Sequence, residues 1–221
     1  MRTQSFSSIN TYYTCARQYD LQYNKKVIPY QETEATLYGG RVHKALEDYA
    51  RDGAPVPEDC LPFAKYVDKI KSLDGTLLLE HQFALTRNMV GTDFDDKSAW
   101  IRGVIDIAVL GKDRAFAGDY KTGKIRTGSD QLKLFAGVML TLNPTIESVR
   151  TAYIWLNHGK TTSESYKRSD LPEIWEHFIA KLRKIELSYD NDKWVPKPSG
   201  LCRGWCGAGR EHCEFWSPRR T

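Results

Sequence analysis

Two carboxylates and a lysine near the middle of the sequence have the residue types and the spacing of a hydrolytic metal site. Asp106 is the one charged residue in the apolar run GVIDIAVL, and Asp119 and Lys121 stand two residues apart in GDYK. If Gly111 pairs with Arg114 across a two-residue turn, Asp106 lies directly opposite Asp119 in a β-hairpin, and Lys121 shares the face of Asp119. Like charges that face each other destabilise a sheet unless a positive charge lies between them, so we predict a bound divalent cation.

Lys121 has a catalytic role in this prediction. An ammonium group beside a metal centre orients an attacking water or stabilises the negative charge that develops on a phosphorane-like transition state. The alternative is a structural ion pair between Lys121 and Asp119 on a solvated face of the sheet. The apolar surroundings of Asp106, together with the second carboxylate at the matching register, favour the metal site.

Three other side chains could reach the same centre. His43 and Glu47 lie four residues apart and therefore share one face of a predicted helix. Such a pair is often only a surface contact, and this alternative stays open. Glu80, in the apolar run LLLEHQF, is a further carboxylate on a predicted strand that could point toward the centre.

The elements that must position these residues are a mixture of helices and strands. Helices are expected at about residues 7–23, 36–51, 63–73, 130–142 and 171–189, the last with Asp170 as its N-cap residue. Strands are expected at about 76–86, 100–110, 114–121, 149–156 and 160–166. This order predicts an α/β fold in which a mixed sheet is flanked by helices.

The composition is that of a globular protein. The chain has 221 residues, of which 41% are hydrophobic and 27% charged, and this length suits one domain with a substantial core. No apolar run approaches the ~20 residues of a membrane-spanning helix, and the start of the sequence lacks the apolar core of a signal peptide. We therefore expect a cytoplasmic protein that is not integral to a membrane. The net charge of +4 is compatible with a nucleic-acid partner but too small to prove one.

Three of the five cysteines crowd together near the C-terminus. Cys202, Cys206 and Cys213 lie within twelve residues of sequence, whereas Cys15 and Cys60 stand far from them. An odd number of cysteines in a chain without an export signal argues against a disulfide framework. Cytosolic cysteines clustered in this way more often bind a metal ion or a metal cluster.

The ordered set of candidate residues resembles a known family of nucleases. The set consists of His43, Glu47, Asp106, Asp119-Tyr120-Lys121 and Gln131, and it resembles the PD-(D/E)xK nuclease superfamily. More narrowly it is similar to the RecB-like exonuclease branch, which includes CRISPR-associated adaptation nucleases and many phage exonucleases. SFSSINTYYTCARQYDLQY resembles the opening helix of that branch, GGRVHKALE its helical histidine motif, and QLKLF its Gln-x-x-x-Tyr helix, with Phe135 in place of the tyrosine. The matching blocks span residues 5–216 in the expected order.

The resemblance implies a fold and a set of metal ligands. The fold is a restriction-endonuclease-like core, with a mixed central sheet and flanking helices. The resemblance implies that His43, Asp106 and Asp119 bind Mg²⁺ or Mn²⁺ together with the carbonyl oxygen of Tyr120, and that Lys121 is the catalytic lysine.

The resemblance also implies roles for residues around the metal ligands. Glu47 is either an accessory ligand or a support for the ligands. Gln131 meets the DNA backbone. Phe135 lacks the hydroxyl of the usual tyrosine, which leaves base stacking as its contact with DNA.

The iron–sulfur variants of this branch use four cysteines to hold a 4Fe–4S cluster that ties the N- and C-terminal segments together. The resemblance implies such a cluster here, with Cys60 left over; its ligands are Cys15, Cys202, Cys206 and Cys213. The spacing Cys-x₃-Cys-x₆-Cys is one residue longer in each gap than the commoner pattern of the branch. A structural Zn²⁺ site, with His212 in place of one thiol, and unligated thiols therefore remain as alternatives.

Two other classes of function compete with a nuclease. Gly118–Lys124 matches the start G-x-x-x-x-G-K of the phosphate-binding loop of a nucleotide-binding protein, but Ile125 stands where a serine or threonine must ligate Mg²⁺. A non-catalytic DNA-binding module is the other class. Basic residues near the site and at the tail could contact DNA phosphates whether the protein is a nuclease or a non-catalytic module. The alternative is that they are scattered, solvated charges. These residues are Lys124, Arg126, Lys133, Arg219 and Arg220.

The sequence as a whole predicts a metal-dependent DNA exonuclease that acts on single-stranded DNA or duplex ends in recombination, repair or phage DNA metabolism. Recombination or replication proteins are candidate partners, and a CRISPR-adaptation-type nuclease that trims DNA within a complex is the nearest alternative. We expect a single nuclease domain over residues 1–221, with its core at about 36–190 and a cluster-binding region formed by about 5–24 and 195–217. Digestion polarity and oligomeric state are not predicted.

Overall fold

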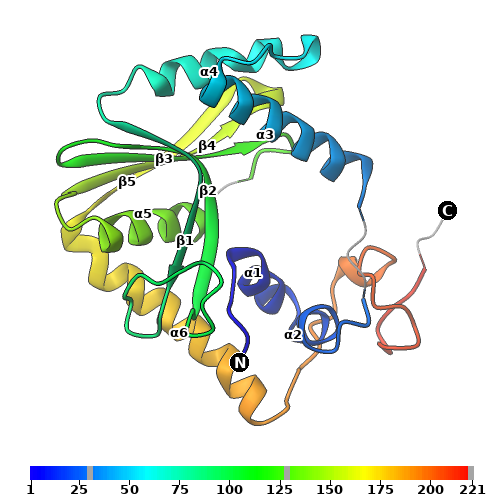
Figure 1. Ribbon diagram of the computed structural model, residues 1–221. Helices are drawn as coiled ribbons and strands as arrows, with labels where there is room; N and C mark the ends of the chain where they lie inside the picture. The colour runs from blue at the N-terminus through cyan, green and yellow to red at the C-terminus, as the bar shows by residue number, and fades with distance from the viewer. Residues whose placement is uncertain (29–31, 127–129, 219–221) are drawn as a thin grey trace. The chain divides into compact units, whose positions relative to one another are not determined.

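A five-stranded β-sheet organises the larger part of the protein in the computed structural model, which describes residues 1–28, 32–126 and 130–218 (Figure 1). The strands are β1 (Thr76–Leu85), β2 (Ile101–Leu110), β3 (Arg114–Lys121), β4 (Ser148–Trp155) and β5 (Lys160–Lys167). They lie in chain order across the sheet, and neighbours are antiparallel except for β3 and β4, which are parallel. The sheet is therefore mixed, and the predicted α/β fold is confirmed.

Helices pack on both faces of this sheet. Figure 1 shows α3 (Glu34–Asp52) and α4 (Leu61–Lys71) over one face and α5 (Asp130–Leu142) over the other. α5 connects the parallel strands β3 and β4, since a hairpin turn cannot join parallel strands. The other helical segments are α1 (Phe6–Thr14), α2 (Ala16–Tyr19), α6 (Leu171–Asp190), a π-helical turn at Asp20–Asn24 and 3-10 turns at Glu58–Cys60, Leu156–His158, Arg168–Asp170 and Gly200–Cys202.

The amphipathic pattern of α3 fixes the direction of two predicted site residues. Thr33 caps the first turn through its side-chain oxygen, which accepts a hydrogen bond from a backbone amide. Val42 and Leu46 are fully buried in the core between this helix and the sheet. His43 and Glu47 each follow one of these buried residues, so they lie at the margin of the buried face, where a side chain can reach the sheet.

The β2–β3 hairpin forms in the register that the sequence predicts. The amide of Gly111 donates to the carbonyl of Arg114 over 2.9 Å. The ladder keeps this register as far as the pair Ile107–Gly118 and then ends. The two strands therefore stop pairing one position before the predicted pair of carboxylates.

The N-terminal segment is divided where one continuous helix was expected. α1 and α2 are separated by Cys15, whose backbone is extended (φ −163°, ψ 114°). The amide of Cys15 still bonds to the carbonyl of Thr11, so α1 ends normally and the chain changes direction at the cysteine. Helical periodicity does not register a break at a single residue. The break occurs at the residue predicted to join the C-terminal cysteines.

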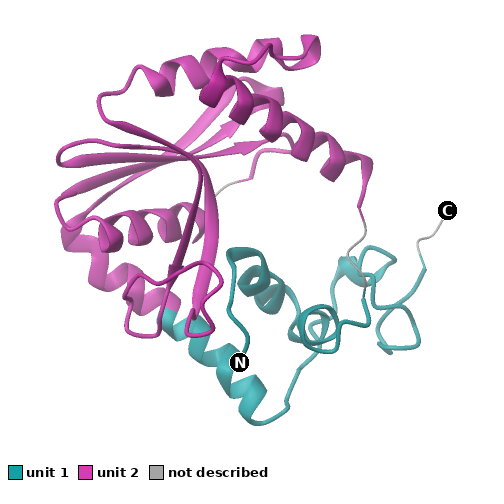
Figure 2. Ribbon diagram, viewed as in Figure 1, with its two compact units in different colours: residues 1–31, 179–221 teal, residues 32–178 magenta. Residues whose placement is uncertain are grey.

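The chain divides into two compact units (Figure 2). Residues 1–31 and 179–221 form unit 1, and residues 32–178 form unit 2. Every residue predicted for the divalent-metal site belongs to unit 2, and the four cysteines predicted for the cluster belong to unit 1. The boundary falls within α6, whereas the predicted core extended to the end of that helix.

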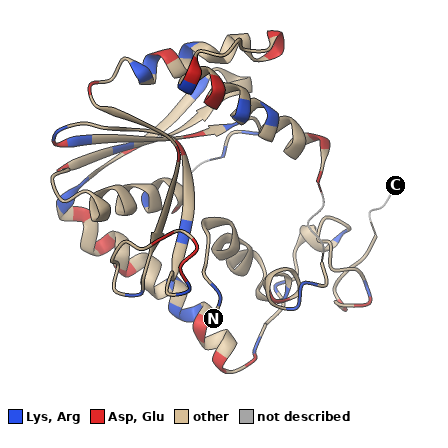
Figure 3. Ribbon diagram, in the orientation of Figure 1, with Lys and Arg blue, Asp and Glu red and all other residues tan. Residues whose placement is uncertain are grey.

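The surface charge of α3 and α4 is mixed. Figure 3 shows lysines and arginines interspersed with aspartates and glutamates along both helices. Within the part of the chain that the structure describes, no helix combines the length and the apolar character needed to cross a lipid bilayer.

Candidate active site

Glu80 and Asp106 occupy neighbouring positions on the first two strands of the sheet. Leu79 pairs with Ile107, and the next position along the ladder brings Glu80 beside Asp106, although these two residues do not themselves pair. The backbone of Glu80 has a φ of 45°, a left-handed conformation that a residue with a side chain adopts only at a cost. Backbone strain of this kind is concentrated at functional sites.

Asp119 extends the same row to a third strand. The β2–β3 ladder ends at Ile107–Gly118, so its next position would join Asp106 and Asp119. The amide of Tyr120 donates to Oδ2 of Asp106 over 2.8 Å, so a carboxylate accepts a hydrogen bond near the end of the ladder. Three adjacent strands thus each place one carboxylate at the same level of the sheet.

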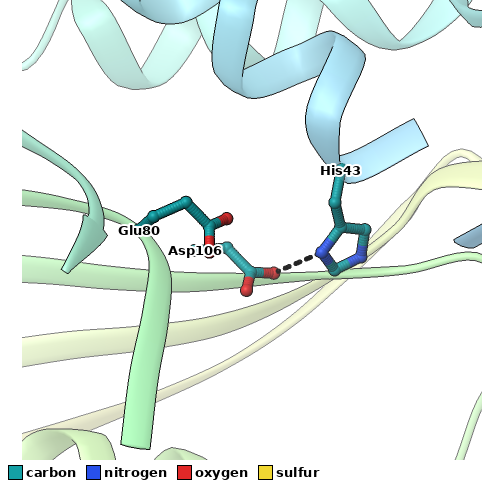
Figure 4. Close-up of side chains that lie close together, drawn as sticks. All are labelled: His43, Glu80 and Asp106. Atoms are coloured by element: carbon teal, nitrogen blue, oxygen red, sulfur yellow. Dashed lines mark ion pairs between the residues drawn. The ribbon is translucent and has the colours of Figure 1, made fainter. Parts of the chain in front are cut away.

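His43 approaches this row from α3. Its Nδ1 lies 3.3 Å from Oδ2 of Asp106, and its Nε2 lies 2.9 Å from the carbonyl oxygen of Tyr120. Figure 4 shows the imidazole directed at Asp106, with Glu80 on the other side of that carboxylate. One potential ligand atom from each of His43, Glu80 and Asp106 lies within 4.8 Å of the other two.

The carboxylates in this row oppose one another electrostatically. The pKa of Asp106 is raised well above its usual value by burial, then by the negative charges of Asp119 and Glu80, against the hydrogen bond from Tyr120. Burial also raises the pKa of Glu80. Because a bound divalent cation would offset this repulsion and carboxylate oxygens are its preferred ligands, the residues fit Mg²⁺ or Mn²⁺.

The pKa of His43 is shifted in the direction that favours metal binding. Burial lowers the pKa of His43, an effect that the negative charge of Asp119 and the hydrogen bond to the Tyr120 backbone partly oppose. A lowered pKa keeps the imidazole neutral near pH 7, and the neutral ring is the form that ligates metals. His43 is therefore a chemically competent ligand beside the carboxylates.

Lys121 and Asp119 form the ion pair that was considered as the alternative to a metal site. Nζ of Lys121 lies 2.5 Å from Oδ2 of Asp119. Asp119 is only 4% exposed, so the pair does not stand on a solvated face of the sheet. Nζ of Lys121 also lies 5.2 Å from the ring centroid of Tyr153, within range of a cation–π interaction.

Gln131 and Tyr153 complete a hydrogen-bonded chain behind Asp119. Nε2 of Gln131 donates to Oδ1 of Asp119 over 2.7 Å, and the hydroxyl of Tyr153 donates to Oε1 of Gln131 over 3.1 Å. Tyr153 was not among the residues predicted from sequence. It pairs with Asp119 in the parallel β3–β4 ladder, and the register of two strands joined through a helix has no local signal in the sequence.

Glu47 does not join the group formed by His43, Glu80 and Asp106. Its carboxylate is bound by Arg51 over 2.6 Å and by Lys44 over 3.3 Å, both on the same helix. Its nearby negative charge contributes to the raised pKa of Glu80. In this arrangement Glu47 acts on the site through its charge, and Glu80 is the additional carboxylate within ligand distance.

The residues predicted to contact DNA have different surroundings. Phe135 is 2% exposed and packs edge-to-face against Phe83, with ring centroids 6.5 Å apart, so its ring is closed to a stacking base. Lys124 and Arg126 are exposed at the end of a described segment. Lys133 lies 3.7 Å from Glu173. Arg219 and Arg220 lie outside the described residues.

The alternative of a phosphate-binding loop does not fit the backbone. Gly118 to Lys121 belong to β3 and pair with β4 in a continuous parallel ladder. A phosphate-binding loop needs a turn whose amides converge on the anion. An extended strand cannot supply that cradle.

The four cysteines predicted to hold a cluster line one small cavity in unit 1. The cavity has a volume of about 20 Å³, and the cysteines are Cys15, Cys202, Cys206 and Cys213. The sulfur of Cys15 accepts a hydrogen bond from the amide of Lys197 over 3.4 Å, and that of Cys202 from the amide of Ser199 over 3.5 Å. Among the described residues, no three of these sulfurs lie within 4.8 Å of one another. Cys60 is fully buried in the core of unit 2.

A mixed sheet that carries a carboxylate on each of three adjacent strands, with a histidine and a lysine beside them, has the ingredients of metal-dependent hydrolysis. The family model described as the PD-(D/E)XK nuclease superfamily matches residues 3–217. The chain therefore belongs to the PD-(D/E)XK nuclease superfamily, and that level of the predicted resemblance is confirmed.

One solved structure has a similar fold. The structure of a candidate exonuclease from Eubacterium rectale is similar to this chain with a TM-score of 0.54 and 11% sequence identity, over 95% of this chain and 88% of the other. The structure of SSO0001 aligns with a TM-score of 0.42 and 13% identity, over 94% of this chain and 84% of the other. No curated protein sequence matches this chain significantly.

Proposed function

We propose that this nuclease is a metal-dependent DNA exonuclease that acts on single-stranded DNA or on duplex ends. The observation that carries the proposal is the row of Glu80, Asp106 and Asp119 across three strands, with His43 and Lys121 beside it. The order of sequence motifs resembling the RecB-like branch supports an exonuclease, and the similar structure from Eubacterium rectale is itself described as a candidate exonuclease.

Different residues of the protein have different roles in the proposed hydrolysis. His43, Asp106, Asp119 and the carbonyl oxygen of Tyr120 would hold Mg²⁺ or Mn²⁺, with Glu80 as an additional ligand or a support for them. The ion, when bound, neutralises charge on the phosphate and lowers the pKa of a water molecule. Lys121 orients the nucleophile and stabilises negative charge on the phosphate oxygens. Gln131 and Tyr153 keep the carboxylate of Asp119 in one orientation.

The cysteines of unit 1 are proposed to hold a 4Fe–4S cluster. The four cysteines line a common cavity, and four thiolates are the ligand set of a 4Fe–4S cluster. The amide donors to Cys15 and Cys202 resemble the hydrogen bonds that tune cluster sulfurs. Anaerobic purification should give a brown protein with four irons per chain. A colourless protein with one equivalent of zinc would instead identify a zinc site.

The proposed setting is the cytoplasm, in recombination, repair or phage DNA metabolism. A CRISPR-adaptation-type nuclease that trims DNA within a complex is the second candidate, supported by the same motif order. The two settings differ in whether the purified chain degrades DNA alone.

The decisive experiment is digestion of end-labelled single- and double-stranded DNA with Mn²⁺, in which the wild-type protein is compared with Asp119→Ala and Lys121→Ala. We expect release of labelled mononucleotides or short oligonucleotides by the wild type and loss of that activity in both variants. EDTA should abolish wild-type activity, and excess Mn²⁺ should restore it. Equal activity in all three proteins would reject the assignment of the site.

A further inference from the structure

Unit 2 contains a concave site that the proposed nuclease activity does not use. It is a cavity of about 410 Å³ between α4 and the β2–β5 part of the sheet, a volume typical of ligand pockets. Its floor is apolar and is formed mainly by Ile70, Val109, Phe116, Ala152 and Ile154. Most of these side chains are buried, so the floor is part of the core rather than a loose surface patch.

The sheet separates this cavity from Asp119 and Lys121. Side chains along β3 alternate between its two faces, so Phe116 faces α3 and α4 together with Tyr120. Asp119 and Lys121 occupy the alternate positions and therefore face the opposite side. A DNA phosphate positioned by Asp119 and Lys121 would not enter the cavity.

Basic residues dominate the rim of the cavity. Lys69, Arg114 and Arg150 line it with a single acidic residue, Asp74. Arg150 pairs directly with Phe116 in the β3–β4 ladder, and Arg114 precedes Phe116 by two positions on the same face of β3. The two arginines therefore flank the aromatic part of the floor.

The arginines are accessible to a ligand. Arg150 is exposed, and its Nη2 donates a hydrogen bond to a neutral acceptor, Oγ of Ser163, over 3.1 Å. The side chain of Arg114 is 83% exposed, and its Nε lies 3.8 Å from the carboxylate of Asp113, a weak surface pair. Guanidinium groups placed in this way can bind carboxylates through two parallel hydrogen bonds.

We propose that this cavity docks an acidic peptide segment of a partner protein. An apolar side chain of the segment fills the cavity over Phe116, and neighbouring carboxylates pair with Arg114 and Arg150. Leu73, which is 44% exposed at the rim, becomes covered when the segment binds. The complementarity of charge, with three cations against one anion, specifies an acidic partner.

A peptide explains the lining better than a nucleic-acid strand does. Proteins that bind single strands place successive aromatic side chains under the bases along a basic track. Apart from Phe116 and Tyr66, the lining of this cavity is aliphatic or polar. An apolar pocket with a cationic rim instead suits one or two buried apolar side chains beside carboxylates.

The test is fluorescence anisotropy with a fluorescein-labelled peptide, Asp-Asp-Glu-Asp-Phe-Leu, in the absence of added divalent metal. We expect the wild type to bind this peptide, and the double variant Arg114→Glu/Arg150→Glu to bind it at least about tenfold more weakly, because attraction becomes repulsion. Leu73→Glu should weaken binding similarly. Arg183→Glu, an exposed charge reversal on α6, is the matched control and should bind like the wild type.

Two control peptides and one competitor complete the test. Replacing the acidic residues by lysine, or Phe-Leu by Ala-Ala, should each weaken binding at least about tenfold. No binding by the wild type at millimolar peptide, or equal binding of the lysine peptide, would overturn the proposal. Displacement of the peptide by a thymidine oligonucleotide from the wild type would assign the cavity to nucleic acid instead. Digestion of short single-stranded DNA should be unchanged in the double variant, which separates this site from the nuclease site.

Discussion

The acidic site of unit 2 and the cysteine site of unit 1 both bring together side chains that repel one another when ionised, but the backbone that holds these side chains differs. In each site the pKa of one potential ligand is raised: burial and then neighbouring carboxylates raise the pKa of Asp106, and burial and then the other three cysteines raise the pKa of Cys206. Each site is therefore better suited to a cation or a cationic cluster than to standing alone.

The scaffolds differ in how they hold the ligands. The carboxylates stand on three neighbouring strands: β1–β2 pairing continues on both sides of Glu80 and Asp106, and the β2–β3 ladder ends one position before Asp106 and Asp119. Cys202, Cys206 and Cys213 lie in a segment of turns and short 3-10 structure. The acidic site is thus preorganised, whereas we expect the cysteine segment to depend on the proposed cluster for order.

The largest expected effect comes from mutating each site separately and measuring the properties of both. Asp119→Ala should lower nuclease activity by about 10³-fold, equivalent to about 4 kcal/mol of transition-state stabilisation, and leave the iron content unchanged. Cys202→Ser should lose the cluster and expose residues 195–217 to proteolysis, yet still bind Mn²⁺ in a calorimetric titration. If Cys202→Ser no longer binds Mn²⁺, the two sites are not independent.

A smaller effect separates the two glutamates near the acidic site. Glu80→Gln should weaken Mn²⁺ binding by about 10–100-fold, the range found when a group supporting a metal site is lost. Glu47→Gln is the matched control and should change affinity by less than about threefold, because Arg51 and Lys44 hold its carboxylate on the helix. The reverse order would restore Glu47 as the accessory ligand and would contradict the role of Glu80.

Tyr153→Phe should lower kcat by about 2–10-fold, which corresponds to the net free energy of one hydrogen bond. KM should be nearly unchanged. Its hydroxyl donates to Gln131, which in turn donates to Asp119, so its loss loosens the carboxylate without removing a ligand. Gln131→Ala should cost at least as much, and the double variant should cost less than the two effects combined. Additive losses in this cycle would mean that Tyr153 does not act through Gln131.

The smallest effect concerns the metal-free protein. A carboxylate whose pKa is raised in the folded state lowers stability at pH values above its unfolded-state pKa, and the loss disappears once the pH falls below that lower value. Asp106→Asn should therefore raise the melting temperature of the EDTA-treated protein near neutral pH, by about 2–4 °C for each kcal/mol relieved. The gain should vanish on acidification. Asp113→Asn, on the exposed turn, should give no gain at either pH, and an equal gain there would refute the explanation by local repulsion.

Much of unit 2 could be read from local sequence patterns. The mixed sheet, the hairpin register and the helix that carries His43 follow from alternation, a two-residue turn and helical periodicity. The register alone was enough to align Asp106 with Asp119. The sequence pattern did not predict that the β2–β3 ladder ends beside Asp106 and Asp119, or that the backbone of Glu80 is strained. Both features depend on contacts among three strands.

Other features of the site could not be predicted because they arise between distant segments. Phe135 fits a helical motif, but its burial against Phe83 is decided by how α5 packs on the sheet. Cys15 falls within a regular helical pattern, and only the folded chain ends the helix there. The cavity beside α4 has no motif at all, because its lining comes from α4 and four strands.

The sequence by itself determined the residue types, their order along the chain and the registers set by short turns, which were sufficient to indicate a nuclease. Tertiary structure decided which carboxylates share a row, that Tyr153 supports Asp119 through Gln131, and that a basic-rimmed cavity lies between α4 and the sheet. The physical reason is that local hydrogen bonding and hydrophobic periodicity are encoded within a few residues. Burial, ion pairing and parallel strand register depend on segments that meet only when the chain folds.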